Sequence, residues 1–165
     1  LEAVQPVDLT ASEISVRLGA TWLTLEIIEE FMFELFSTPR YCQWNIHVHY
    51  AQYTGEWNVE GKSYDRSNVK AYNTYGTGRV NGYKIMEETL NLRDVRIFDY
   101  IEDGNGMKTA LLNKKETAIA QGKQELIKQA FADWIWSDPE RREQLTKLYN
   151  EKFNSIRPAS MTAAT

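Results

Sequence analysis

The sequence predicts an α+β domain in which antiparallel β-hairpins pack against several helices and a long helical pair closes the chain. Apolar residues recur at helical spacing in several long segments. Residues 44–50 and 56–60 instead alternate between polar and apolar side chains, as half-buried strands do. The sequence Asp-Gly-Asn-Gly at residues 103–106 is typical of a tight hairpin turn. Because short turns join antiparallel strands, these signals favour hairpins over a wound parallel sheet.

Length and composition indicate one globular domain. The 165 residues are 42% hydrophobic and 25% charged, no apolar run approaches the ~20 residues of a membrane-spanning helix, and Cys42 has no second cysteine to pair with. We therefore expect a cytoplasmic domain without membrane contact. The chain starts at Leu1 in a loop-like stretch, which we interpret as the start of a piece of a longer polypeptide. The expected organisation is a linker at 1–9, a domain at 10–154 and a flexible tail at 155–165.

The first two helices are predicted from their end signals. Thr10 and Glu13 form a capping-box pattern, so a short helix is expected to follow and to stop at Gly19. Thr24 begins a stronger helix, and Pro39 ends it. The apolar stripe of this second helix comprises Leu25, Ile28, Phe31, Met32, Leu35 and Phe36.

The first hairpin is predicted over residues 44–50 and 56–60, around a turn at residues 51–55. Residues 61–78 are polar, basic and rich in tyrosine, with a brief helix expected near residues 68–72. The inward face of the hairpin is expected to carry Trp44, Ile46, Val48, Tyr50, Trp57 and Val59.

The second half is predicted to contain three helices and a hairpin. A helix is expected over residues 77–90, although its two glycines disfavour it. Strands are expected near residues 95–101 and 107–112. Asn113 then caps a helix that extends to about Trp136, and an Asp-Pro pair at 138–139 caps a last helix that ends near residue 153. The inward residues of the long helix are expected to be Ile119, Leu126, Ile127, Ala130, Phe131 and Trp134.

No complete catalytic constellation is found, and no catalytic residue, metal or cofactor is predicted. The stretch at residues 75–79 has two glycines and a base but not the spacing of a phosphate-binding loop. His47 and His49 share one strand face, and with Cys42 or Glu56 they form an incomplete metal-ligand set. Solvated or hydrogen-bonded histidines and a buried structural thiol are the favoured interpretations.

The charge is unevenly distributed. The net charge of −4 divides into −7 over residues 1–60, from nine acids and two bases, and +3 over residues 61–165. Residues 61–84 alone carry a net charge of +4, with tyrosines between the lysines and arginines. Such a stretch suits a nucleic-acid strand, because cations pair with phosphates and aromatic rings stack on exposed nucleobases. A solvated basic loop whose tyrosines pack on the sheet is the alternative. The candidate nucleic-acid-binding residues are Lys62, Tyr64, Arg66, Lys70, Tyr72, Tyr75, Arg79 and Lys84.

Residues 11–32 also have a superficial helix-turn-helix pattern. Its second helix carries four carboxylates, at Glu26, Glu29, Glu30 and Glu34, which would repel phosphates. A DNA-recognition role for this helix is therefore disfavoured.

Several strings together resemble a segment of very large bacterial proteins of conjugative and other mobile elements. These proteins combine an N6-adenine DNA methylase region with an SNF2-type helicase region. The resemblance extends from about Pro6 to Pro158 and includes no catalytic motif. The matching strings are DLTASEI (8–14), RLGATW (17–22), YTGEW (53–57), TYGT (74–77), LNLRDVR (90–96), LNKKET (112–117), DWIW (133–136), DPERR (138–142), YN (149–150), FNS (153–155) and RP (157–158).

The resemblance implies a connector that follows the methylase region and precedes the helicase core. On this basis we expect a non-catalytic accessory domain that assists DNA binding or orients the helicase core. Its expected partners are DNA and the neighbouring helicase and methylase regions. The alternative is a structural, protein-binding connector without direct DNA contact, which docks through the helix near residues 24–36 or the helix that ends near Trp136.

Overall fold

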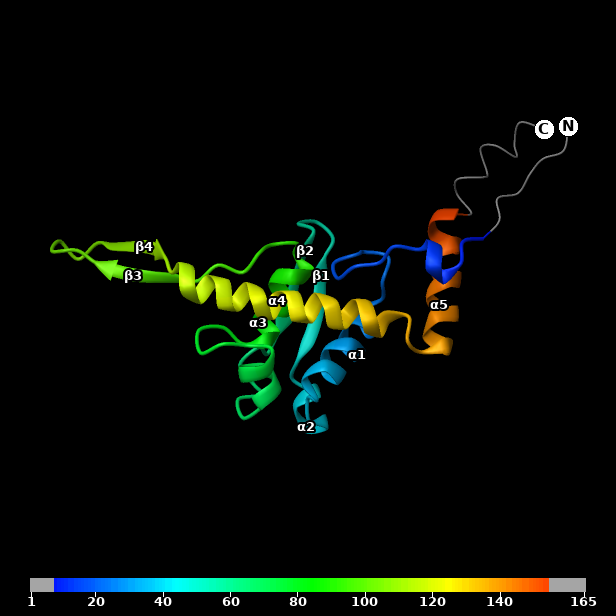
Figure 1. The fold of residues 1–165 in the computed structure, drawn as a ribbon, viewed down its shortest axis with the longest axis horizontal. Helices are drawn as coiled ribbons and strands as arrows, with labels where there is room; N and C mark the ends of the chain where they lie inside the picture. Colours follow the sequence, from blue (N-terminus) through cyan, green and yellow to red (C-terminus); the bar gives the residue numbers. More distant parts are fainter. Residues whose placement is uncertain (1–7, 155–165) are drawn as a thin grey trace, which may run out of the picture.

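The computed structural model describes residues 8–154 and confirms an α+β fold with two separate antiparallel hairpins. Figure 1 shows the long helix α4 (Lys114–Ile135) running through the molecule, with the β3–β4 hairpin at one end and α5 at the other. The elements in chain order are η1 (Ala11–Glu13), α1 (Leu25–Phe36), α2 (Arg40–Gln43), β1 (His47–Ala51), β2 (Glu56–Glu60), η2 (Lys70–Thr74), α3 (Gly82–Leu90), β3 (Phe98–Glu102), β4 (Lys108–Leu112), α4 (Lys114–Ile135), α5 (Pro139–Tyr149) and η3 (Asn150–Asn154).

The core lies where α1, α3 and α4 meet the inner face of the β1–β2 hairpin. Phe31 of α1 contacts Phe131 of α4 edge to face, with ring centroids 5.1 Å apart. Phe36 packs in the same way against the fully buried Tyr83 of α3. Gly82 is required here, because a Cβ at this position would lie only 2.7 Å from the Phe36 ring. The glycine that disfavours the helix in isolation thus permits close packing of α1 on α3.

Side chains from the helices satisfy the open edges of the β1–β2 hairpin. On the β1 edge, the Val48 amide donates to the Glu29 carboxylate of α1 at 2.7 Å. On the β2 edge, the Asn91 amide group pairs with both the N–H and the C=O of Trp57. The Val59 amide donates to Glu87 of α3 at 2.9 Å. These bonds replace the strands that would flank the hairpin in a larger sheet.

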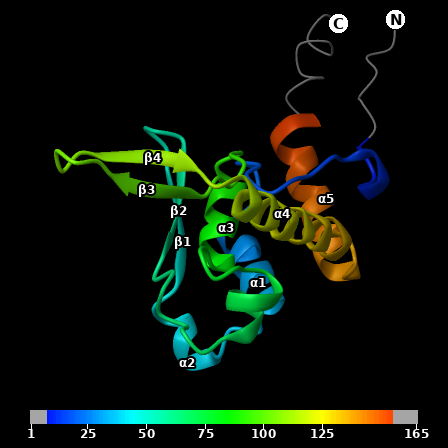
Figure 2. The ribbon, with the colours of Figure 1, turned by 60° about the vertical axis from the view of Figure 1, so that its left-hand side comes forward.

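The β3–β4 hairpin projects from the body as an arm (Figures 1 and 2). Its base is held by an ion pair of 2.9 Å between Arg79 and Asp99 and by a hydrogen bond from Asn113 to Asp99. Beyond this base the strands are exposed on both faces. The exposed large apolar side chains of the arm are Tyr100, Ile101, Met107, Leu111 and Leu112.

The C-terminal helical pair is joined by a buried arginine. Arg141 of α5 donates to the backbone carbonyls of Trp134 and Ile135 at the end of α4, and its guanidinium lies 3.5 Å from the Trp134 ring centroid. The arginine therefore satisfies carbonyls that have no partner within α4. Near the other end of α5, the Asn150 side chain pairs with the N–H and C=O of Leu9 and holds the start of the described chain against this helix.

Most predicted elements form, with corrected bounds. The capping box of Thr10 is present, but the helix after it is only the turn η1, because the chain becomes extended at Ile14 to bury that side chain. Helix α3 begins at Gly82 rather than near residue 77, since the Thr77 hydroxyl holds the amides of residues 79 and 80 in a loop. Helix α5 ends at Tyr149 but continues directly into the π-helical turn η3 to Asn154, so the predicted helical end near residue 153 is confirmed.

Predictions of inward-facing residues are wrong at three positions. Trp44 is 80% exposed, because the unpredicted helix α2 precedes it and the strand begins only at His47. Ile119 and Leu126 of α4 are also exposed. The face of α4 that meets the core is instead formed by Thr117, Ala120, Gln124, Ile127, Phe131 and Ile135.

The expected tail at residues 155–165 and most of the expected linker at residues 1–9 lie outside the described residues. Within the described part of the chain, no helix is both long enough and apolar enough to cross a bilayer.

The contacts of Glu87 predict a pH-dependent stability. Burial opposes ionisation of this carboxyl, but hydrogen bonds from Lys62, the Val59 amide and Lys84 outweigh it and lower its pKa below the ordinary 4.5. A lowered pKa in the folded state stabilises the protein above about pH 4.5, and this stabilisation is lost as the pH falls through the lowered value. We expect Glu87→Gln to reduce the free energy of unfolding at pH 7 by about 1–3 kcal/mol.

Urea unfolding between pH 3 and pH 7 measures this effect. The difference between the wild type and Glu87→Gln should shrink as the pH falls below 4.5, whereas the exposed Glu125→Gln should match the wild type throughout. A difference between the wild type and Glu87→Gln that does not change with pH would contradict the proposed role of the charge.

Candidate nucleic-acid interface

The short helix α2 presents a cation and two aromatic rings at one end of the domain. Ser37 adopts a left-handed conformation that ends α1, and Pro39 then starts α2 with a fixed φ. Cys42 is buried on the inner side of this turn. The outer side carries Arg40 and Tyr41, and Trp44 follows directly; Tyr41 is 71% exposed.

The loop of residues 61–75 packs beside α2 and is anchored by a buried carboxylate, Asp65. Asp65 accepts hydrogen bonds from Tyr83 at 2.9 Å, Asn68 at 2.6 Å and the Cys42 thiol at 3.7 Å. Asn68 also donates to the Phe36 carbonyl at the end of α1. The carboxylate therefore ties the loop to α1, α2 and α3 at once.

The donors to Asp65 remain protonated. Burial raises the pKa of the Cys42 thiol, and the adjacent Asp65 carboxylate raises it further. Burial also raises the pKa of the Tyr83 hydroxyl, with Asp65 adding to the effect. Both groups therefore donate to Asp65 as neutral groups at physiological pH, which agrees with the interpretation of Cys42 as a structural thiol.

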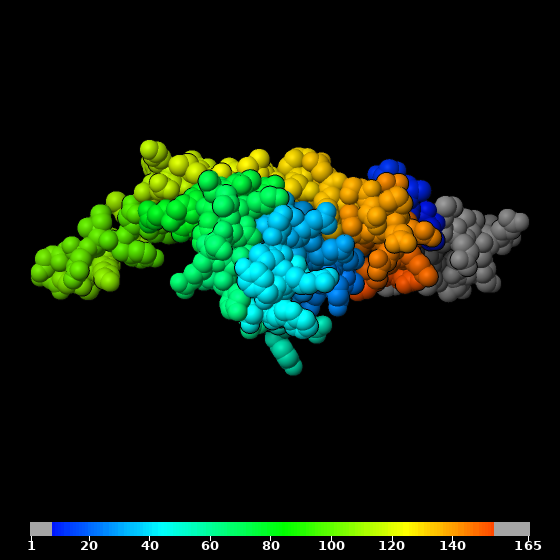
Figure 3. All heavy atoms as spheres, turned by 90° about the horizontal axis from the view of Figure 1, so that it is seen from below, coloured from blue at the N-terminus to red at the C-terminus, as the bar shows by residue number. Residues whose placement is uncertain are grey.

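Together, α2 and the loop form what we call the α2–loop surface (Figure 3). Contacts between the two segments, including Lys70 with Ser37 at 2.9 Å and Cys42 with Asp65, place them side by side. Asp65 is the only acid in residues 37–45 and 61–75, and it is buried. The exposed residues that define the surface are Arg40, Tyr41, Trp44, Tyr64, Arg66, Val69 and Lys70.

The structure places only part of the sequence-predicted set on this surface. Tyr64, which is 54% exposed, Arg66 and Lys70 belong to it. Lys62 is half-buried at the start of the loop, in an ion pair of 2.6 Å with Glu87. Lys84 pairs with the same carboxylate from α3.

The remaining predicted residues are also occupied elsewhere. Arg79 holds the base of the arm through Asp99 and the Phe98 carbonyl. Tyr72 and Tyr75 are half-buried and pack against the core, Tyr75 on the Phe36 ring. Of the eight predicted residues, three thus belong to the α2–loop surface. Arg40 and Tyr41 join them from α2, a helix that the sequence did not reveal, and Trp44 joins them from the residue that follows it.

The two histidines of β1 have individual partners. His47 lies 2.9 Å from the Trp44 carbonyl and 3.8 Å from the Glu29 carboxylate, and His49 contacts Glu60 at 2.7 Å. Over residues 8–154, no group of three or more His, Cys, Asp or Glu side chains is arranged to hold a metal ion.

Three of the four acids of α1 contact other elements of the fold. Glu29 accepts the Val48 amide, Glu34 accepts the Trp134 indole N–H, and Glu30 lies 3.8 Å from Arg141. Helix α1 therefore packs against β1, α4 and α5 rather than standing free as a recognition helix does.

Comparison with models of protein families matches residues 17–155 to a domain of unknown function, DUF8437. No curated protein and no solved structure matches the chain.

The Asp65 contacts predict that this carboxylate stabilises the whole α2–loop surface. Asp65→Ala removes the acceptor shared by Tyr83, Asn68 and the Cys42 thiol, and we expect the free energy of unfolding to fall by about 2–4 kcal/mol in urea denaturation. Asp94→Ala, at an exposed position, should change it by less than about 0.5 kcal/mol. Equal effects of the two substitutions would show that the buried contacts of Asp65 contribute nothing.

Proposed function

The chain belongs to the family of the domain of unknown function DUF8437, and from that premise we propose that it is a non-catalytic accessory domain that contacts DNA through the α2–loop surface. The observation that carries the proposal is the composition of that surface. Three exposed aromatic rings lie among three cations, and the two segments that form it expose no acid. The resemblance to mobile-element proteins supports a parent protein that methylates and translocates DNA.

The chemistry of the surface suits a nucleic-acid strand. Arg40, Arg66 and Lys70 supply positive charge for phosphates, and Trp44, Tyr41 and Tyr64 supply flat rings on which bases can stack. Arg66 and Lys70 have no carboxylate partner among the described residues, so their charge is not neutralised within the fold. Such a surface holds a strand without cleaving or modifying it.

Fluorescence anisotropy with a labelled oligothymidylate and a labelled duplex of the same length tests this proposal. Because stacking contributes about 1–3 kcal/mol per base, Trp44→Ala should weaken binding by roughly tenfold. Arg66→Ala with Lys70→Ala should reduce the slope of log affinity against log salt by about 1.4 for a single strand.

Matched controls are available outside the surface. Tyr53, fully exposed at the β1–β2 turn, lies at the other end of the hairpin from α2, so Tyr53→Ala should leave binding unchanged. Lys84→Ala removes a cation that already pairs with Glu87 and Glu88, and it should also have little effect. The proposal fails if no salt-sensitive binding occurs, or if Tyr53→Ala weakens binding as much as Trp44→Ala.

A second candidate function rests on the β3–β4 arm, which we propose docks on a neighbouring region of the parent polypeptide. Between residues 99 and 111, no side chain of the described chain bonds to the open edges of the arm. An exposed edge with apolar side chains on both faces is a template for strand pairing with another surface. In this role the domain orients the helicase core, with or without DNA.

A pull-down with the separately purified helicase region tests the arm in the absence of DNA. Ile101→Thr with Leu111→Thr keeps β-forming residues on the two strands but removes apolar surface, so capture should fall at least fivefold while far-ultraviolet circular dichroism is unchanged. Val69→Thr, an exposed apolar position on the α2–loop surface, serves as the control and should retain capture. Full capture by the arm variant would exclude the arm as the docking element.

A further inference from the structure

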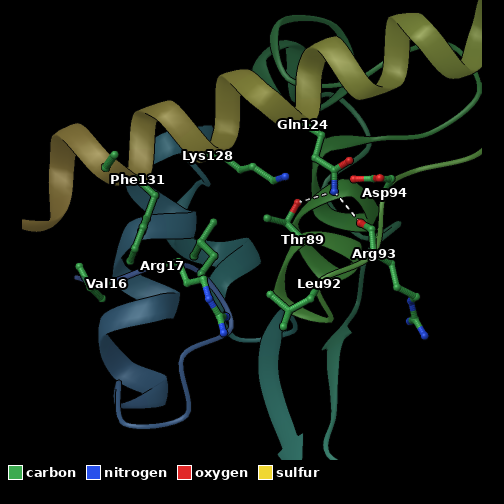
Figure 4. A pocket seen from close by; sticks show the side chains of 11 residues that line it. Val16, Arg17, Thr89, Leu92, Arg93, Asp94, Gln124, Lys128 and Phe131 are labelled. Carbon is green, nitrogen blue, oxygen red and sulfur yellow. Dashed lines mark hydrogen bonds between the residues drawn. The ribbon is translucent and has the colours of Figure 1, made fainter.

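A cavity of about 380 Å³ lies under α4, on a part of the domain distinct from the α2–loop surface. Figure 4 shows its walls, which come from the extended segment before α1, the end of α3 and the middle of α4. The volume falls in the range typical of small-molecule sites. The apolar part of the lining consists of Val16, Leu18, Leu92, Phe131 and Ala132.

One wall of the cavity carries a leucine in a conformation that favours glycine. Leu92 has a φ of 61° and follows the end of α3. Its amide donates to the Thr89 carbonyl and the Arg93 amide donates to the Glu88 carbonyl, which is the pattern of a Schellman motif. At this position glycine avoids the steric cost of Cβ.

Burial does not explain the leucine, because 62% of the residue is exposed. Residues held in sparsely populated backbone conformations cluster at active sites and ligand-binding sites. The positive φ and the exposure of Leu92 therefore indicate that a ligand or partner contacts this residue.

The opposite wall is held rigid by a buried glutamine. Gln124 of α4 donates to the Thr89 hydroxyl at 3.1 Å and to the Arg93 carbonyl at 2.8 Å, and it accepts from the Val95 amide (Figure 4). These bonds fix α4 relative to the end of α3. The cavity thus exists before any ligand enters, which reduces the entropic cost of binding.

The charged side chains at the cavity favour an anion. Arg17 has no ion-pair partner within residues 8–154, and Lys128 contacts only the exposed Glu125 at 3.4 Å. Asp94 is the one acid in the lining, and Arg93 is neutralised by Glu88. Figure 4 shows Lys128 directed toward the side of Asp94, whereas Arg17 points the other way, so Arg17 is the cation that is available to an anion.

We propose that this cavity binds a small amphipathic anion, with its apolar body against Leu92 and Phe131 and its anionic group beside Arg17. The apolar lining supplies most of the binding free energy, and Arg17 orients the ligand. This site does not depend on DNA binding at the α2–loop surface.

A matched pair of fluorescent probes tests the proposal on the intact chain. The anionic probe is 8-anilinonaphthalene-1-sulfonate, and the neutral probe is 1-anilinonaphthalene, which lacks only the sulfonate. We expect the anionic probe to bind with 1:1 stoichiometry and a dissociation constant on the order of 10–100 µM. The neutral probe should bind more weakly and without salt dependence.

Two substitutions separate the apolar contribution from the charged one. Arg17→Gln should weaken the anionic probe about threefold to tenfold and leave the neutral probe unchanged. Leu92→Gly should weaken both probes about fivefold or more, while the melting temperature stays the same or rises because the strained φ is relieved. A stable variant with reduced binding thus distinguishes loss of a site from loss of the fold.

Leu111→Ser is the control for the other exposed apolar surface, the arm, and should leave both probes unaffected. The proposal is overturned if the anionic probe does not saturate at one site, if Arg17→Gln weakens both probes equally, or if Leu111→Ser rather than Leu92→Gly abolishes binding.

Discussion

The fold depends on how the open edges of the two-stranded β1–β2 sheet are satisfied. A hairpin alone is marginally stable in water, and its outward N–H and C=O groups need partners once helices cover it. Here Glu29, Glu87 and Asn91 act as those partners. Because they come from α1 and from the C-terminal half of α3 and its cap, satisfying the edges also sets the position of both helices. The hairpin and the helices are therefore stabilised by one set of bonds.

The β3–β4 hairpin has the same topology but a different environment. It is anchored only at its base, by Arg79, Asp99 and Asn113, and between residues 99 and 111 no side chain of the described chain bonds to its outer edges. One two-stranded hairpin, β1–β2, therefore forms part of the core, whereas the other, β3–β4, projects from the body as an arm. The β1–β2 hairpin is covered by α1 and α3, whereas no helix packs on the β3–β4 hairpin in this way within the described chain.

The sequence predicts the elements of this fold better than its surfaces. Turn and capping signals act locally, so the hairpin turn at residues 103–106 and the caps at Thr24, Asn113 and Asp138 are found correctly. Helix α2 has only four residues, too few to show a helical period, and the alternation of β1 extends backwards to Trp44 by coincidence.

Only part of the α2–loop surface is predicted from the sequence, because its composition depends on contacts between residues far apart in the chain. Whether the charge of a cation is neutralised depends on which acid lies beside it in the folded structure. Lys62 reaches Glu87 across 25 residues, and Arg79 reaches Asp99 across 20, so no local pattern shows that their charge is neutralised.

The acidic first part of the chain is likewise not a uniform acidic face, because Glu29, Glu30 and Glu34 are directed toward partners in β1, α5 and α4. Local potential follows from the charges left exposed, and net charge does not reveal where they lie. The α2–loop surface has positive character because its one acid, Asp65, is buried beneath it. The carboxylate that holds the loop in place therefore does not reduce the positive charge of the exposed cations.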